Sequence, residues 1–111
     1  MTRLTTTVRI GPGHIRLILA GEIDLSSVDV FLRAQGEALA GAASRRLTGV
    51  VVDLDRVTFL DSTGIGALVG GFRQAATAGL TYELRSPRGP VARILQVAGV
   101  LSTLAPSPQA A

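Results

Sequence analysis

The chain has 111 residues, 47% of them hydrophobic and 17% charged, which suits one folded domain with a single core. The absence of cysteine excludes disulfides and thiolate metal sites, and no apolar run approaches the ~20 residues of a membrane span. The net charge is +3 without any lysine, but the arginines are scattered and have no interleaved aromatic residues, so we expect no direct nucleic-acid binding. We expect a cytoplasmic protein without membrane insertion, with one domain over residues 1–104 and a disordered tail over residues 105–111.

Two strands and a helix are predicted in the first half of the chain. Apolar residues alternate over residues 4–10 and 14–20, on either side of a Gly-Pro-Gly turn, which is typical of a hairpin. Ser26 followed by Asp29 resembles a capping box, and the apolar spacing after it predicts a helix over residues 28 to about 40. We expect residues 41–46 to form a loop.

The second half is predicted to contain a strand, a helix and a strand in a parallel crossover. The expected bounds are residues 47–54, 63–78 and 80–85, with Gly79 ending the helix. A last helix over residues 91–98 and a short edge strand over residues 100–104 follow. The sum is an α/β fold, in which helices pack against a single mixed sheet of four to five strands.

The segment over residues 58–68 connects the predicted central strand to the next helix. Asp61, Ser62 and Thr63 are of the types that cap helix starts, because their side-chain oxygens accept hydrogen bonds from unpaired backbone N–H groups. One interpretation of Ser62 is a plain N-cap, which the local chemistry favours. The other is a phosphorylation site, where a charge of about −1.5 to −2 would disrupt a surface that a partner buries.

This helix is expected to have two distinct faces. One side is predicted to carry Ser62, Gly66, Val69 and Arg73, and the apolar face is predicted to carry Ile65, Leu68 and Phe72. Glycine inside a helix lowers the stability of the helix by about 1 kcal/mol relative to alanine, so the presence of Gly66, Gly70 and Gly71 requires an explanation. The two interpretations are close packing of the helix on the sheet and close approach of a partner's backbone.

The residue patterns argue against an enzyme, a cofactor site or a metal site. The glycines at residues 64–70 imitate a dinucleotide fingerprint, but the third one is displaced by a position. Without lysine there is no Gly-Lys-Ser/Thr phosphate loop. His14 is the only candidate base for Ser62, and no Gly-x-Ser-x-Gly turn surrounds that serine.

Three segments together resemble the STAS domain of bacterial anti-sigma factor antagonists. They are VVVDL (residues 50–54) with FLDSTGIG (residues 59–66), GEID (residues 21–24), and SP (residues 86–87) with VARIL (residues 91–95) and AGV (residues 98–100). The resemblance covers roughly residues 4–104 in order. It differs at the C-terminus, where Pro106 and Pro108 closely follow Leu104 although members of this family often end in a further helix.

The resemblance implies a fold, a partner and a switch. The implied fold is a mixed sheet with helices packed on it. The unphosphorylated protein is expected to bind an anti-sigma factor, which is usually also a serine kinase, and this binding frees a sigma factor. The kinase then uses ATP to phosphorylate one serine of the family's motif, and a phosphatase removes the phosphate. Ser62 matches that serine, and Thr63 is a less favoured acceptor. The implied partner-binding residues are Asp24, Asp61, Ser62, Thr63, Gly64 and Gly66, together with Val69 and Arg73 from the helix projection. The alternative is an accessory STAS subunit of a membrane lipid-transport or permease complex.

Overall fold

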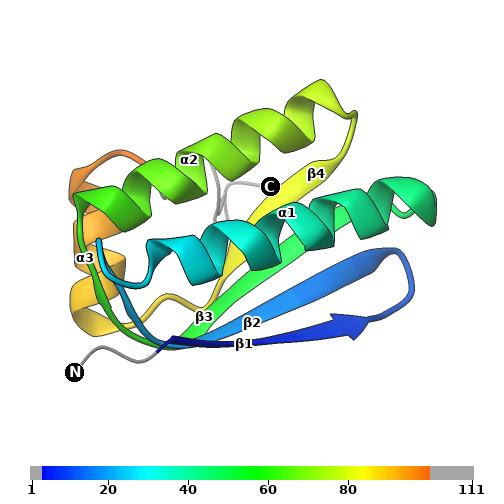
Figure 1. The fold of residues 1–111 in the computed structure, drawn as a ribbon. Helices are drawn as coiled ribbons and strands as arrows, with labels where there is room; N and C mark the ends of the chain where they lie inside the picture. The colour runs from blue at the N-terminus through cyan, green and yellow to red at the C-terminus, as the bar shows by residue number, and fades with distance from the viewer. Residues whose placement is uncertain (1–3, 101–111) are drawn as a thin grey trace.

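Four strands form one mixed sheet in the order β1-β2-β3-β4 in the computed structural model, which describes residues 4–100 (Figure 1). The strands are β1 (Leu4–Ile10), β2 (His14–Ile23), β3 (Gly49–Leu60) and β4 (Thr81–Arg85), and the helices are α1 (Val28–Ser44), α2 (Ser62–Thr77) and α3 (Gly89–Val97). The β1–β2 pair is antiparallel and the other two pairs are parallel. The predicted α/β class, the hairpin and the parallel crossover through α2 are therefore confirmed.

Helices α1 and α2 lie side by side over one face of the sheet, and both begin at the same end of it (Figure 1). Alternate residues of the strands point towards these helices, as the buried Leu17 and Leu19 in β2 and Val50 and Val52 in β3 show. Helix α3 lies at the end of the sheet where α1 and α2 begin (Figure 1). This arrangement places the starts of all three helices near the ends of the parallel strands.

Helix α1 is longer than predicted, and the predicted loop over residues 41–46 is wrong for its first part. Ala42 is fully buried, so the helix gains by continuing across the sheet to Ser44. Gly41 permits this, because a Cβ at this position would lie 2.9 Å from Cδ1 of Ile15. The glycine that suggested a helix end is thus a point of close packing against β2.

The predicted capping box at Ser26 and Asp29 is also wrong. The N-cap of α1 is Ser27, whose hydroxyl donates at 2.7 Å to the carbonyl oxygen of Glu22 instead of capping the helix. The backbone N–H and the hydroxyl of Ser26 both donate to Oδ1 of Asp24, at 3.0 and 2.8 Å. Asp24 therefore organises the turn that leads into α1.

Strand β3 continues to Leu60, beyond the predicted end at residue 54. The extension is stable because Val57 and Leu60 are buried, and because pairing with β2 resumes after two register shifts and ends at the pair Ile23–Leu60. The strand consequently delivers the chain directly to Asp61 and the start of α2.

A buried polar network connects three elements inside the domain. The hydroxyl of Tyr82 in β4 donates to Oε1 of Gln35 in α1, and Nε2 of Gln35 donates at 3.2 Å to the carbonyl oxygen of Ala67 in α2. Burial raises the pKa of Tyr82 far above its ordinary value. The network fixes how the two helices sit on the sheet, because an unmade hydrogen bond here would leave a polar group buried without a partner.

The C-terminal predictions are tested only in part. Helix α3 begins at Gly89, slightly before the predicted start, and has a proline in its first turn, where the missing N–H costs no hydrogen bond. Val100 is described and is not in a strand, and the rest of the predicted strand over residues 100–104 lies outside the described residues, as does the predicted tail. In residues 4–100, none of the helices combines the length and apolar character that a membrane crossing needs.

Candidate functional site

The carboxyl ends of β2 and β3 lie side by side and bring two acidic residues to one end of the sheet. Ile23 and Leu60 are paired at the ends of these strands, and the backbone N–H of Asp61 donates at 3.3 Å to the carbonyl oxygen of Ile23. Asp24 and Asp61 follow directly after the two paired strand ends. The pairing of β2 with β3 therefore brings Asp24 and Asp61 close together.

Asp61, not Ser62, caps α2. Asp61 has extended backbone dihedrals, and its Oδ1 accepts a hydrogen bond of 3.1 Å from the backbone N–H of Gly64. Ser62 is the first residue of the helix and is exposed. Within residues 4–100, no hydrogen bond engages its hydroxyl, so the plain N-cap interpretation of Ser62 is wrong.

The predicted strip along α2 is accessible from solvent. Ser62, Gly66 and Arg73 are exposed, and Val69 is half-buried. A Cβ added at Gly66 or at Gly70 would meet nothing within 4 Å, so internal packing does not explain either glycine. The backbone of α2 is therefore accessible at these two glycines, which follow Ser62 along the helix.

Two other glycines of α2 have a packing role instead. A Cβ at Gly64 would lie 2.4 Å from Cδ1 of Leu60, and a Cβ at Gly71 would lie 2.2 Å from Oε1 of Gln35. The packing interpretation is therefore confirmed for Gly71 and is wrong for Gly66 and Gly70, where the close approach of a partner's backbone stays a prediction. Thr63 is half-buried next to the buried Gly64, which makes it less accessible than Ser62.

The apolar face of α2 differs from the prediction in its position. The buried residues of the helix are Gly64, Ala67, Leu68, Gly71 and Ala75. Leu68 was correctly expected to be buried, whereas Ile65 and Phe72 are half-buried at the margin of the core. The small residues let α2 pack closely, and they leave the larger apolar side chains at its flanks.

Two exposed apolar residues near the acidic pair were missed by the sequence analysis. Leu25, directly after Asp24, is 78% exposed, and Phe59, two residues before Asp61, is 46% exposed. Both belong to the same end of the sheet as Ser62. The alternation of side chains along a strand was the available signal for the exposure of Phe59, because Phe59 points away from the face of the sheet that the buried Leu60 occupies.

A nucleophile–base pair between Ser62 and His14 is excluded by the topology. His14 begins β2 and is paired with Gly49 at the start of β3, whereas Ser62 follows the opposite end of β3. The ten residues of β2 separate these two ends of the sheet by ~30 Å. In the described part of the chain, no three His, Asp or Glu side chains come together as a potential metal site.

Three arginines are already paired with acidic side chains. The pairs are Arg16–Asp53 at 3.5 Å, Arg85–Glu83 at 3.0 Å and Arg88–Asp55 at 2.6 Å. These contacts are exposed in varying degree and contribute little to stability. Each pair places a carboxylate beside the arginine and so offsets its positive charge locally.

The geometry is that of a small α/β domain that presents a capped helix start, two acids and an accessible serine at the end of a mixed sheet. The chain belongs to the STAS-domain family, since the family model described as "Mlab, STAS domain" matches residues 6–104. The predicted family is therefore confirmed. Among curated proteins, no match is found.

Solved structures of anti-sigma factor antagonists share this fold. One from Mycobacterium paratuberculosis is 25% identical, with a TM-score of 0.76 over 96% of this chain and 89% of that one. The unphosphorylated form of the antagonist SpoIIAA is 24% identical, with a TM-score of 0.64 over 86% and 82% of the two chains. The phosphorylated form of the Bacillus cell fate determinant SpoIIAA is 23% identical, with a TM-score of 0.59 over 86% and 85%. The two SpoIIAA structures support the fold alone.

Proposed function

We propose that this chain is an anti-sigma factor antagonist whose partner binding is switched off by phosphorylation of Ser62. The observation that carries the proposal is the division of roles at the start of α2, where Asp61 caps the helix and the exposed Ser62 hydroxyl has no structural hydrogen bond to another described residue. The unphosphorylated form binds an anti-sigma factor with serine kinase activity and thereby frees a sigma factor. The kinase transfers the terminal phosphoryl group of ATP to the Ser62 oxygen, and a phosphatase removes it.

The surroundings of Ser62 make a phosphate there tolerable for the fold and unfavourable for a complex. The unpaired N–H groups and the dipole at the start of α2 accept an anion without refolding the domain. Arg73, on the same strip, lies about three turns away, ~16 Å along the helix, which is too far for an ion pair. A phosphate next to Asp61, and near the strand end that carries Asp24, adds charge that a partner would have to bury without compensation.

The contact surface in this proposal combines the strip on α2 with the neighbouring loop ends. Gly66 and Gly70 let a partner's backbone approach the helix, and Val69 and Arg73 border that approach. Leu25 and Phe59 provide exposed apolar contacts at the sheet end. Buried aromatic anchors surrounded by weaker contacts are the usual source of binding energy at such surfaces.

A second function uses the same surface without the switch, as an accessory subunit of a membrane lipid-transport or permease complex. It is favoured by the observation that Gly66, Gly70 and Phe59 would contact a partner whether or not Ser62 is modified. The two functions predict different fates for Ser62.

Incubation with ATP and an anti-sigma kinase from the same genome, followed by mass spectrometry, separates the two functions. We expect one phosphate on Ser62, none on the Ser62→Ala variant, and continued phosphorylation of the Thr63→Ala variant, which serves as the matched control. An unmodified Ser62 in a chain that co-purifies with a transporter ATPase would instead support the accessory subunit.

A further inference from the structure

Strand β1 forms an edge of the sheet without the features that usually protect such an edge. In the sheet of the described residues, β1 has β2 as its only neighbour. Natural edge strands are commonly shortened, charged, bulged or interrupted by proline, because an open edge can pair with another strand. The seven residues of β1 include only one charged residue, Arg9, and neither proline nor glycine. By contrast, β4 has five residues and carries both Glu83 and Arg85.

The side chains of β1 that point towards the helices are only partly covered. Val8 is opposite the buried Leu17 and Ile10 is opposite the buried Ile15, so both lie on the helix-covered face of the sheet. Yet Val8 is 47% exposed and Ile10 is 55% exposed. The margin of the core is therefore open along β1.

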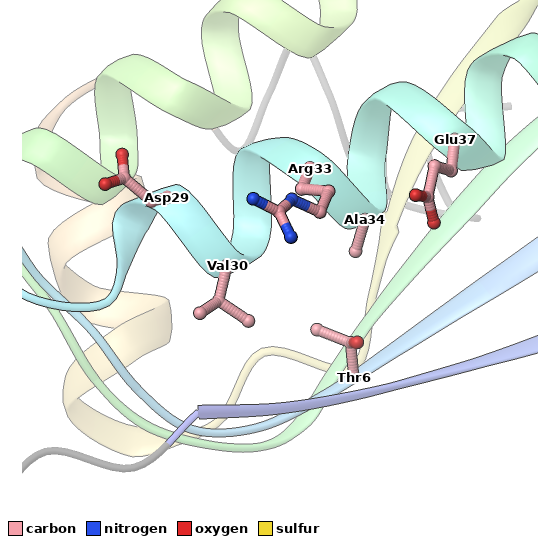
Figure 2. Close-up of a pocket in the computed structure, with 6 residues that line it drawn as sticks. All are labelled: Thr6, Asp29, Val30, Arg33, Ala34 and Glu37. Atoms are coloured by element: carbon pink, nitrogen blue, oxygen red, sulfur yellow. The ribbon is translucent and has the colours of Figure 1, made fainter.

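A groove with a volume of about 240 Å³ lies between α1 and this strand. Figure 2 shows Val30 and Ala34 pointing from α1 towards β1, where Thr6 forms the opposite side. The other residues that line it are charged, namely Asp29, Arg33 and Glu37. The groove thus has an apolar floor and a rim with charges of both signs.

We propose that a second copy of this chain pairs its β1 antiparallel to this β1, about a two-fold axis at Thr7. In that register Thr7 lies opposite Thr7 of the second copy, Thr6 lies opposite Val8, and Leu4 lies opposite Ile10. All seven residues of the strand are paired, and the residues that face the helices in one copy meet residues that face the helices in the other. The two sheets become one continuous sheet, and the backbone N–H and C=O groups on the open side of each β1 gain hydrogen-bond partners.

The choice of a second copy rests on the fit of the exposed Val8 to the groove beside its own strand. Val8 of the second copy lies opposite Thr6, so its side chain enters the groove that Thr6, Val30 and Ala34 line. A register shifted by one residue would oppose apolar and polar faces, and Arg9 would lie opposite Leu4.

Cysteine cross-linking of the full chain tests this register directly, because the natural sequence contains no cysteine. Opposite residues of antiparallel strands have Cα atoms about 4.5–5.5 Å apart, which permits a disulfide. We expect the Thr7→Cys variant to form a covalent dimer under mild oxidation. The matched control is Thr5→Cys on the same strand face, whose two copies would lie ~14 Å apart, and we expect it to cross-link at least about tenfold more slowly. Equal rates for the two variants would overturn the register.

Sedimentation velocity on the cysteine-free protein tests the dimer without a cross-link. We expect concentration-dependent dimerisation that the Val8→Glu variant weakens by about tenfold or more, and that Leu32→Glu leaves unchanged. Leu32 is 45% exposed, close to the value for Val8, but it is on the opposite side of α1 from Val30. Circular dichroism of both variants verifies that they fold. An unmodified chain that remains an 11.5 kDa monomer up to about 1 mM, or that pairs β1 with an extended segment of another protein instead, would overturn the proposal.

Discussion

Oδ1 of Asp61 accepts a hydrogen bond of 3.1 Å from the backbone N–H of Gly64, and this contact gives the capping role to Asp61 and not to the neighbouring Ser62. A helix start needs acceptors for its unpaired N–H groups, and Asp61 provides one from the position before the helix. Ser62 consequently has no structural task that its modification would disturb. Gly64 is required beside it, because a larger residue would collide with Leu60.

The first prediction concerns the stability of α2. Asp61→Ala should lower the free energy of unfolding by about 1 kcal/mol, because it removes the cap. Asp61→Asn keeps an acceptor in place and should retain most of the stability, and Ser62→Ala should change it by less than about 0.5 kcal/mol. Urea unfolding of the three variants measures these differences. A loss in Ser62→Ala as large as that in Asp61→Ala would show that the serine has a capping role after all.

The second prediction distinguishes two neighbouring glycines of α2. Gly71→Ala should destabilise the domain by about 2 kcal/mol, because the new Cβ displaces Gln35 and disturbs its hydrogen bond with Tyr82. Gly70→Ala introduces the same methyl group into open space, and it should stabilise the helix by up to about 1 kcal/mol. Thermal unfolding of both variants tests the assignment, which fails if the two shift the melting temperature in the same direction.

These glycines illustrate what the sequence could and could not predict. Local periodicity was sufficient for the hairpin, the crossover and the helix that Ser62 begins, because each depends on residues close in the chain. It could not separate Gly71 from Gly70, since the difference is the side chain of Gln35, which arrives from another helix. The end of α1 was missed for the same reason, because Gly41 stops a helix in isolation but here packs against Ile15.

The site residues were predicted mainly through the resemblance to a family. Local chemistry favoured a plain cap for Ser62, and only the structure shows that Asp61 has taken that role. Leu25 was overlooked because an apolar residue in a loop carries no sign of its exposure, and Phe59 was overlooked although strand alternation places it opposite the buried Leu60. Exposure depends on which neighbours cover a residue, and those neighbours are distant in the sequence.

The third prediction concerns alkaline pH. Tyr82 is protonated in the folded state because burial raises its pKa, whereas in the unfolded chain it ionises with a pKa of about 10. Its contribution to stability is fully present below pH ~10 and is lost as the pH rises further, by about 1.4 kcal/mol per unit. The chain has no lysine, no cysteine and no other tyrosine, so this one group accounts for the side-chain titration in that range.

Tyrosinate absorbance and circular dichroism should therefore change together during alkaline unfolding. The Tyr82→Phe variant is the control, because it should lose the pH dependence although it is less stable at neutral pH, where Oε1 of Gln35 lacks its donor. Ionisation of Tyr82 near pH 10 in a domain that remains folded would contradict its burial.

The fourth prediction concerns the exposed aromatic residue beside the acidic pair. Phe59→Ala should weaken binding to the anti-sigma factor by about tenfold or more, because it removes an apolar anchor from the proposed contact surface. Ile10→Ala is the matched control, since Ile10 is similarly exposed but lies at the other end of the sheet, next to Ile15. Titration calorimetry with each variant measures the difference. Equal losses in the two variants would remove Phe59 from the surface.

The most direct measurement of the central claim is the affinity of the anti-sigma factor for the chain with and without a phosphate on Ser62. Calorimetry of the two homogeneous forms, with their far-ultraviolet circular dichroism compared, separates an effect on binding from an effect on folding. We expect the same fold and at least about 100-fold weaker binding of the phosphorylated form, which corresponds to ~3 kcal/mol for an uncompensated charge. Equal affinity of the two forms would contradict a switch at this serine.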